Sequence, residues 1–399
     1  MIDGLLVPTR LDGMAAFPGD DVTIRLVCKH ELTPDWAEVR PFQERWPDLP
    51  EEMKRRFYDR GGDMTPGAGG TTTTIFNPHT QVTERQFLSL GGTEYNCAGG
   101  ATPWGSWLSC EECFEYEGSI RYFDAAARRD RKHGYVFEVD AYSDELVDAV
   151  PIKAMGRFEH EACAIHEPTG IVYMTEDRQY GLFYRYIPDV PGKLIEGGLL
   201  QALVIKNRPS TQTRNWSAKP DVALNKPYET AWVDVGNPDP DDNNLRLTGA
   251  KLGAATFARG EGLCDAGDRF AFTCTEGGHA HVGQVFTYKP SPFEGTTGEQ
   301  DEPGELTLIA ESSRDSLLQN ADNLVMAPWG DLVVCEDTAG HCGLVGIRPD
   351  GTQYALADNT YSNSELAGAC FSPDGKILFV NIQHPGMTLA ITGPWPTSG

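Results

Sequence analysis

Short apolar runs recur along the chain, and five of the six end in acidic residues. An apolar run of this length, bounded by turn-forming residues, is typical of a buried strand. The runs are "IRLVCKHE" to Glu31, "SWLSCEE" to Glu112, "GIVYMTED" to Asp177, "RFAFTCTE" to Glu276, "DLVVCED" to Asp337 and "KILFVNIQ" to Gln383. The pattern predicts six strands whose ends are in phase.

Each of these strands is expected to have antiparallel neighbours. Four segments that begin with Gly alternate apolar and polar residues, as a half-buried strand does; they are "GYVFEVDAYS", "GLFYRYIPD", "GQVFTYKPS" and "GLVGIRPDG". Upstream strands end in turn sequences, as in "ACAIHEPTG", "NLVMAPWG" and "GACFSPDG", where Pro and Gly favour a hairpin. Each repeat therefore predicts a small antiparallel sheet.

A recurring sheet unit predicts an all-β fold, and more specifically a six-bladed β-propeller that forms one domain over residues 1–399. A β-sandwich is the alternative architecture. It gives no reason for acidic strand ends in phase, whereas equivalent strand ends of a propeller meet around its central channel. We therefore expect the blades to enclose a central metal site.

Two glycine-rich stretches are expected to be irregular. In "NCAGGATPWGSWLSCEE" the glycines and Pro103 predict a loop that places Cys97 in a turn, with a strand from Trp107 onward. In "GGHAHVG" the glycines likewise predict a loop, with His279 and His281 as weaker candidates for metal ligands.

Charge narrows the classes of partner. The chain has 58 Asp and Glu against 33 Lys and Arg, a formal net charge of -25, which argues against nucleic acid because phosphate backbones need a basic surface. No apolar stretch is long enough to span a membrane, and the first residues lack the pattern of a signal peptide.

Acidic residues crowded at strand ends repel one another unless cations lie between them. Several carboxylates suit Ca²⁺, which takes 6 to 8 oxygen ligands. Capping of strand ends and turns is the alternative role for each of them. The strand-end candidates are Glu31, Glu111, Glu112, Glu176, Asp177, Glu276, Glu336 and Asp337.

Further candidates lie beside the predicted strands. Cys97 would add a soft thiolate to hard oxygen ligands, a combination suited to a transition metal, although a buried inert cysteine is the simpler alternative. In "GRFEHEACAI" alternation places Glu159 and Glu161 on one side of the strand. In "FARGEGLC", Arg259 can bind a phosphate through its guanidinium fork or pair with neighbouring acids.

Several motifs resemble the PhoX-type alkaline phosphatases. They are "GGTEYNCAGGATPWGSWLSCEE", "GRFEHEACAI", "TFARGEG", "ADNLVMAPWGDLVVCED" and "SELAGACFSPDGKILFVNIQHPG". The resemblance implies a six-bladed propeller with Fe³⁺ and Ca²⁺ at its centre. It implies Arg259 as the catalytic, phosphate-binding residue and a set of metal ligands: Glu31, Cys97, Glu111, Glu112, Glu161, Glu261 and Asp337, with Glu159, Glu336 and Glu365 as weaker candidates.

The resemblance also implies a function. We expect a metal-dependent phosphatase that hydrolyses phosphate monoesters, with diesters as a second substrate class. A small-molecule phosphoester would be its partner, and it would act as a monomer in the periplasm or outside the cell. Two alternatives stay open, namely a calcium-dependent lactonase or esterase on a propeller, and a non-catalytic binding propeller stabilised by metals.

Overall fold

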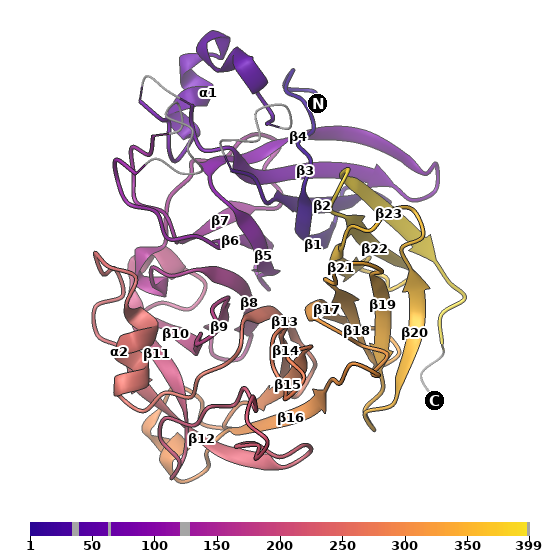
Figure 1. Cartoon of the computed structure of the whole chain (residues 1–399). Coiled ribbons are helices and arrows are strands. Elements are labelled where there is room, and N and C mark those ends of the chain that lie inside the picture. Colours follow the sequence, from indigo (N-terminus) through magenta and orange to yellow (C-terminus); the bar gives the residue numbers. More distant parts are fainter. Residues whose placement is uncertain (34–39, 63–64, 120–127, 397–399) are drawn as a thin grey trace. The chain divides into compact units, whose positions relative to one another are not determined.

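The structure is a computed structural model that describes residues 1–33, 40–62, 65–119 and 128–396. Its fold is all-β, with few and short helices (Figure 1). The chain divides into two compact units, the first made of Met1–Pro151 and Ala367–Trp395 and the second centred on Ile152–Leu366.

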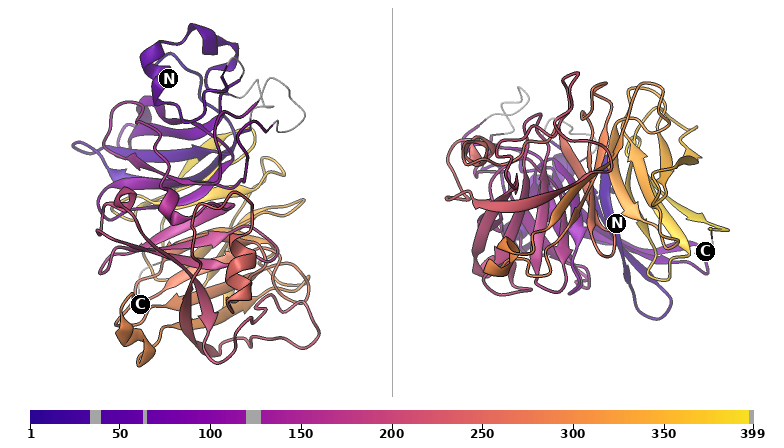
Figure 2. Two further views of the ribbon diagram at one scale, coloured as in Figure 1. Left: turned by 90° about the vertical axis from the view of Figure 1, so that its left-hand side faces the viewer. Right: turned by 90° about the horizontal axis from the view of Figure 1, so that it is seen from below.

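The first unit holds three antiparallel sheets, in the strand orders β1-β2-β3-β4, β5-β6-β7 and β21-β22-β23. The strands are β1 (Leu11–Pro18), β2 (Ile24–His30), β3 (Gly69–Asn77), β4 (Val82–Thr93), β5 (Asn96–Ala101), β6 (Ser106–Glu111), β7 (Val136–Asp140), β21 (Leu366–Phe371), β22 (Ile377–Ile382) and β23 (Met387–Thr392). A 3-10 helix, η2 (Gln43–Asp48), and helix α1 (Glu51–Arg56) precede β3. Strands β3 and β4 form a long hairpin (Figure 2).

The second unit holds a nine-stranded sheet, ordered β13-β14-β15-β16-β12-β11-β10-β9-β8, and the sheet β17-β18-β19-β20. Two antiparallel meanders make up the larger sheet and join where β12 pairs with β16. The strands are β8 (His160–His166), β9 (Ile171–Glu176), β10 (Phe183–Pro188), β11 (Gly198–Ile205), β12 (Pro227–Asp234), β13 (Gly260–Asp265), β14 (Phe270–Cys274), β15 (Gln284–Lys289), β16 (Glu305–Glu311), β17 (Ala321–Met326), β18 (Leu332–Glu336), β19 (Gly343–Ile347) and β20 (Gln353–Asp358). The helices are η3 (Lys153–Met155), η4 (Leu194–Glu196), α2 (Leu245–Lys251) and η5 (Thr297–Gln300).

The predicted strands and hairpins are confirmed. Each acid-ending run forms a strand that stops at or just before its acid, and each Gly-initiated segment forms the next antiparallel strand. The second strands are buried along their whole length, as β9 and β18 are. Continuous apolar runs therefore reflect burial on both faces.

The core of each unit is apolar and aromatic. In the first unit Val27, Leu90, Tyr135 and Phe137 belong to one buried cluster. In the second unit the rings of Phe183 and Phe272 stack with centroids 4.5 Å apart. These side chains lie on the strands or directly beside them, so the cores hold the strands that carry the acids at their ends.

One local prediction is wrong. The segment Asn96–Ala101 is a strand and not a loop. A Cβ added to Gly99 would lie 2.0 Å from the carbonyl oxygen of Leu108 on the paired strand β6. Glycine is needed here because two backbones approach closely, and not because the chain turns.

The other glycine-rich prediction is confirmed, since residues 277–283 form a loop between β14 and β15. Among the described residues, none of the helices has the length and hydropathy needed to cross a bilayer.

Candidate metal and phosphate site

A bulge interrupts the first strand of five successive sheet repeats. The register shifts lie between Leu11 and Met14, Asn96 and Gly99, His160 and Cys163, Gly260 and Leu263, and Ala321 and Leu324. A bulge bends the strand and redirects the side chain at the extra residue. The first residue inside each shift is a metal-ligand type: Asp12, Cys97, Glu161, Glu261 and Asp322.

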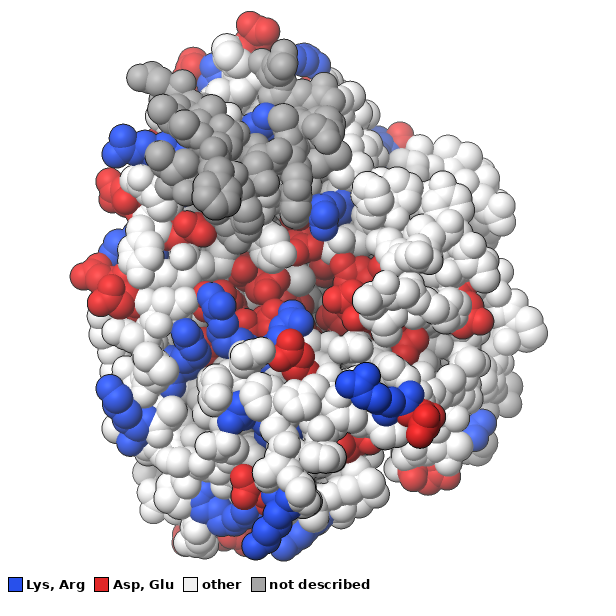
Figure 3. Space-filling view, in the orientation of Figure 1, with Lys and Arg blue, Asp and Glu red and all other residues white. Residues whose placement is uncertain are grey.

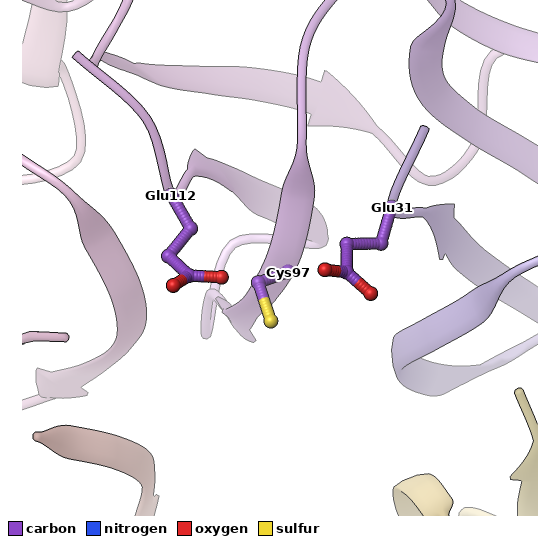
Figure 4. A group of neighbouring side chains, drawn as sticks. All are labelled: Glu31, Cys97 and Glu112. Atoms are coloured by element: carbon purple, nitrogen blue, oxygen red, sulfur yellow. The ribbon is translucent and has the colours of Figure 1, made fainter. Parts of the chain in front are cut away.

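In the first unit the bulge of β5 brings Cys97 beside two strand-end acids. Ligand atoms of Glu31, Cys97 and Glu112 all lie within 4.8 Å of one another. Figure 4 shows Glu31, which follows β2, and Glu112, which follows β6, pointing toward the sulfur of Cys97. The Cys97 thiol also donates to Oδ2 of Asp12 over 3.6 Å. One thiolate and several carboxylates thus share a small volume.

Glu31 is held in place by the last strand-end residue of this unit. Nε2 of Gln383 donates to Oε2 of Glu31 over 2.6 Å, and Arg10 donates to Oε1 of Gln383. Glu31 is 6% exposed. Gln383 occupies the position at which the other repeats end in an acid. Its neutral amide orients the Glu31 carboxylate without adding another negative charge.

In the second unit two groups of acids share one member. Ligand oxygens of Glu161, Glu261 and Asp322 lie within 4.8 Å of one another, and so do those of Asp322, Asp337 and Glu365. Asp322 therefore lies close to the predicted residues Glu161 and Glu261 in one group, and to Asp337 and the weaker candidate Glu365 in the other.

Two threonines connect the bulges of neighbouring repeats in this unit. Thr175 on β9 accepts from the backbone N–H of Ala162 and donates to the carbonyl of Glu261, over 3.1 and 2.5 Å. Thr273 on β14 donates in the same way to the carbonyl of Asp322. Since each threonine joins its own repeat to the next bulge, the acids on successive bulges are kept adjacent.

Burial and mutual repulsion act on two of these acids, Glu261 and Asp337. Burial raises the pKa of Glu261 well above its usual range, and the charges of Asp177 and Glu161 add to this effect while Arg259 opposes it. Burial also raises the pKa of Asp337, again with Arg259 opposing and Asp177 reinforcing. A bound cation would relieve this repulsion.

Arg259 lies among these acids. Its Nε and Nη2 donate to the two oxygens of Asp177 over 2.7 and 2.6 Å, and Nη2 is 3.0 Å from Oε1 of Glu261. The Arg259 side chain is 34% exposed, and its φ of +54° is rare for a residue with a Cβ. In the space-filling view Lys and Arg side chains lie among Asp and Glu side chains over β8, β9 and β13 (Figure 3).

The structure corrects the prediction for Glu111. Its carboxylate is fully buried and turns away from Cys97 into the sheet. Oε1 accepts from the Glu94 N–H and from Nδ1 of His133, over 3.0 and 2.6 Å. Oε2 accepts from the N–H groups of Gly134 and Tyr135. Because both oxygens are occupied by protein donors, Glu111 stabilises the start of the next strand.

Glu336 and Glu176 have the same role as Glu111. Glu336 accepts from the N–H groups of Gln319 and Gly343, and Glu176 accepts from the N–H of Leu182 and the hydroxyl of Tyr184. The first acid of each strand-end pair therefore fixes the following Gly-initiated strand. Successive residues of a strand point in opposite directions, so the second acid, as at Glu112 and Asp337, faces the ligand group.

Glu159 also differs from its prediction as a ligand. Its Oε1 accepts from Arg178 and from Nδ2 of Asn243, and it does not belong to the acidic groups found among the described residues. Glu276 lies at the edge of this region, where its Oε2 accepts from Gln179 over 3.0 Å.

Asp12 and Asp322 are the residues that sequence reasoning missed. Each is the second residue of the first strand of a repeat, Asp12 in β1 and Asp322 in β17. Alignment of the strand starts would have placed them with Cys97, Glu161 and Glu261. A bulge leaves no mark in the apolar pattern itself, so alternation alone could not indicate their direction.

The donor set fits the expected metals. Buried carboxylates that repel one another suit Ca²⁺, and a thiolate beside carboxylates suits a transition metal such as iron. Cys97, Glu31 and Glu112 could hold one metal ion, and the all-carboxylate groups of the second unit could hold others.

Comparison with known proteins identifies the family of this chain. The family model "Alkaline phosphatase PhoX" matches residues 3–386. The structure of Pseudomonas fluorescens PhoX in complex with vanadate, a transition state analogue, has a TM-score of 0.63 to this chain, 18% identity, and coverage of 94% of this chain and 84% of that chain.

A gluconolactonase from Xanthomonas campestris has a TM-score of 0.39 at 12% identity, with 94% of this chain and 83% of that chain covered. The curated proteins contain no match to the chain. The family model spans nearly the whole sequence, and the chain is therefore a member of the PhoX family of alkaline phosphatases and a metal-dependent phosphatase, as its motifs predict.

Proposed function

We propose that the chain hydrolyses phosphate monoesters, with diesters as a second substrate class, at a centre of ferric iron and calcium. The observation that carries this proposal is the convergence of Cys97 with Glu31 and Glu112 within 4.8 Å. A site for calcium alone needs no thiolate, so the calcium-dependent lactonase leaves Cys97 without a role.

We propose further that the antiparallel meanders are six blades of one propeller domain, with the metals at its centre. The repeated bulges and strand-end acids support this arrangement, because equivalent residues of successive blades line a propeller channel. The TM-score of 0.63 to Pseudomonas fluorescens PhoX also supports it.

The metals would supply Lewis acidity, which draws charge from the phosphate oxygens and lowers the pKa of a coordinated water. The protein residues bind and orient the ester. Arg259 offers a planar guanidinium that matches two phosphate oxygens and cannot lose its charge. Its donors would stabilise the charge that builds up in the trigonal bipyramidal transition state.

Asp177 acts as a positioning residue for Arg259. Its bidentate bonds, at 2.7 and 2.6 Å, fix the plane of the guanidinium. The backbone adds to this, since the Arg259 N–H donates to the carbonyl of Arg178 over 2.9 Å. A preorganised donor of this kind needs little reorganisation during the reaction.

The test compares Cys97→Ser with the wild type on a phosphomonoester and on a lactone. Loss of iron and of phosphatase activity in the variant, with no lactone hydrolysis by either protein, is the expected result. Lactone hydrolysis that survives the substitution would instead support the calcium-dependent lactonase. A fully metal-loaded protein that hydrolyses neither substrate would support the binding propeller.

Two further predictions of the family resemblance remain proposals. We propose that the chain acts as a monomer, which size-exclusion chromatography with light scattering tests directly. Export to the periplasm or the medium is the second, and fractionation of the native source tests it.

A further inference from the structure

A column of aromatic and cationic side chains lies on the second unit. The Cζ atom of Arg214 is 4.0 Å from the ring centroid of Tyr180 and 4.1 Å from that of Trp216. The ring of His281 stacks on Trp216, with centroids 4.6 Å apart and an interplanar angle of 29°. The loop "GGHAHVG" thus contributes an aromatic ring to this column.

The column is only partly buried. Arg214 is 5% exposed, yet Tyr180 is 52% exposed. Within the part of the chain that the structure describes, Nε and Nη1 of Arg214 have no hydrogen-bond acceptor, and Nη2 donates to Gln212 over 2.7 Å. The two rings are therefore its main stabilising contacts, and the guanidinium holds Tyr180 with much of its surface toward solvent.

Two loops that bind Arg259 also bear on the column. Tyr180 belongs to the loop that begins with Asp177 and Arg178, the residues that bind the side chain and backbone N–H of Arg259. On the other side, the indole of Trp216 donates to the carbonyl of Glu276 over 2.8 Å.

Residues 178 and 275 connect these loops to the backbone of Arg259. The N–H of Thr275, next to Glu276, donates to the carbonyl of Arg259 over 3.0 Å. Gln179, next to Tyr180, donates to the Glu276 carboxylate over 3.0 Å. The loops that fix Arg259 are therefore the loops that carry Tyr180 and support Trp216.

The aromatic face of the column is accessible to a ligand, since Tyr180 is 52% exposed. A ring that only filled the core would be covered, as Tyr173 and Tyr184 of the same unit are. His281 has a φ of +58°, uncommon for a histidine, and its side chain is exposed. Exposed rings held by a cation offer flat, electron-rich surfaces on which planar ligands stack.

We propose that this aromatic column is a leaving-group subsite, in which Tyr180 stacks on the planar part of an aromatic or heteroaromatic phosphate ester. The inference rests on the proposed function, because it assumes that Arg259 binds the phosphate. On this basis, phosphate esters of aryl alcohols and nucleosides should have a higher kcat/KM than phosphate esters of small aliphatic alcohols. Tyr180 would act on specificity and leave the chemistry at the phosphorus unchanged.

The experiment measures kcat/KM of the metal-loaded protein for adenosine 5′-monophosphate and for glycerol 3-phosphate. Tyr180→Leu removes the ring but keeps an apolar side chain, and Tyr180→Phe is the matched control that keeps the ring. We expect Tyr180→Leu to lose about tenfold in kcat/KM for the nucleotide, the factor that 1.4 kcal/mol of stacking represents. The value for glycerol 3-phosphate should change by less than about twofold, and Tyr180→Phe should resemble the wild type for both esters.

Inhibition by adenosine provides a second readout that does not depend on turnover of a nucleotide. With glycerol 3-phosphate as substrate, the inhibition constant of adenosine should rise about tenfold in Tyr180→Leu and stay unchanged in Tyr180→Phe. An equal loss for both esters, or no loss for either, would overturn the subsite. A wild-type protein that hydrolyses neither ester would contradict the proposed function itself, so the two failures are distinguishable.

Discussion

The substitution Glu111→Gln separates the two roles that a strand-end acid can have. In the structure Glu111 is fully buried and accepts four hydrogen bonds. Gln keeps one acceptor oxygen. Its amide NH₂ replaces the other oxygen, which accepts two hydrogen bonds in the wild type, and an NH₂ group cannot accept them. Two buried donors would lose their acceptor, at a cost of about 1–3 kcal/mol each.

The charge of His133 adds to this loss. Burial alone would lower the pKa of His133, but the charges of Glu111 and Glu94 together with hydrogen bonds to Asp59 and Glu111 raise it to about 10. The imidazolium would keep only Asp59 as a hydrogen-bonded carboxylate. We therefore expect the free energy of unfolding to fall by about 4 kcal/mol in total.

The assay is thermal unfolding of the chelated protein, so that metal binding does not contribute to Tm. A loss of 1 kcal/mol lowers the Tm of a unit of 150–250 residues by about 2–4 °C, so Glu111→Gln should lower Tm by about 10 °C. Glu112→Gln is the matched control, since it faces Cys97 and Glu31. We expect it to change Tm by less than about 2 °C, because Glu112 is half-buried and its carboxylate faces the acidic ligand group, where the loss of one negative charge relieves repulsion, and to lose iron when metals are supplied.

The opposite pattern would refute this reasoning. If Glu111→Gln unfolded at the wild-type temperature and failed to bind iron, Glu111 would be the ligand and the direction of both side chains would be reversed. A large fall in Tm for Glu112→Gln would likewise assign the structural role to that residue.

Three other predictions follow from the same contacts. Asp177→Asn should lower kcat/KM for a phosphomonoester by roughly 10- to 100-fold, because it loosens the guanidinium of Arg259; an unchanged value would remove Asp177 from the site. Burial, with the charge of Glu159, raises the pKa of Glu176 to about 8. Its contribution to the free energy of unfolding is therefore complete below the pKa of an unfolded glutamate and is lost as pH rises from there through about 8. Chelated wild type should lose about 3 kcal/mol between pH 5 and 8 in urea unfolding relative to Glu176→Gln, and parallel pH curves would contradict the shift. Gly99→Ala should destabilise the protein by roughly 1–3 kcal/mol and weaken iron binding at Cys97, whereas Gly340→Ala, with no atom within 4 Å of its added Cβ, should have little effect in the same unfolding and iron-binding assays.

The sequence predicted the strands well because burial dominates their composition. The second strand of each repeat is apolar on both faces and ends in a charged residue, so both its length and its end are visible in the pattern. The Gly-initiated strands were equally clear. The loop at 277–283 followed from its glycines.

The direction of individual side chains was less predictable. Glu111 and Glu112 are adjacent and chemically identical, and only the hydrogen bonds from Gly134 and His133, residues distant in sequence, decide which of them faces Cys97. The strand Asn96–Ala101 was taken for a loop because glycine serves both turns and close backbone contacts. Asp12 and Asp322 depend on bulges, which the apolar pattern does not record.

The metal content of the purified, unchelated protein, measured by elemental mass spectrometry, tests the central claim most directly. The measurement should be made on the wild type and on Cys97→Ser. The proposed centre predicts iron and calcium, each at about one per chain or more, with the iron lost in Cys97→Ser. Calcium without iron in the wild type, or iron that is unaffected by the substitution, would contradict a site built on Cys97, Glu31 and Glu112.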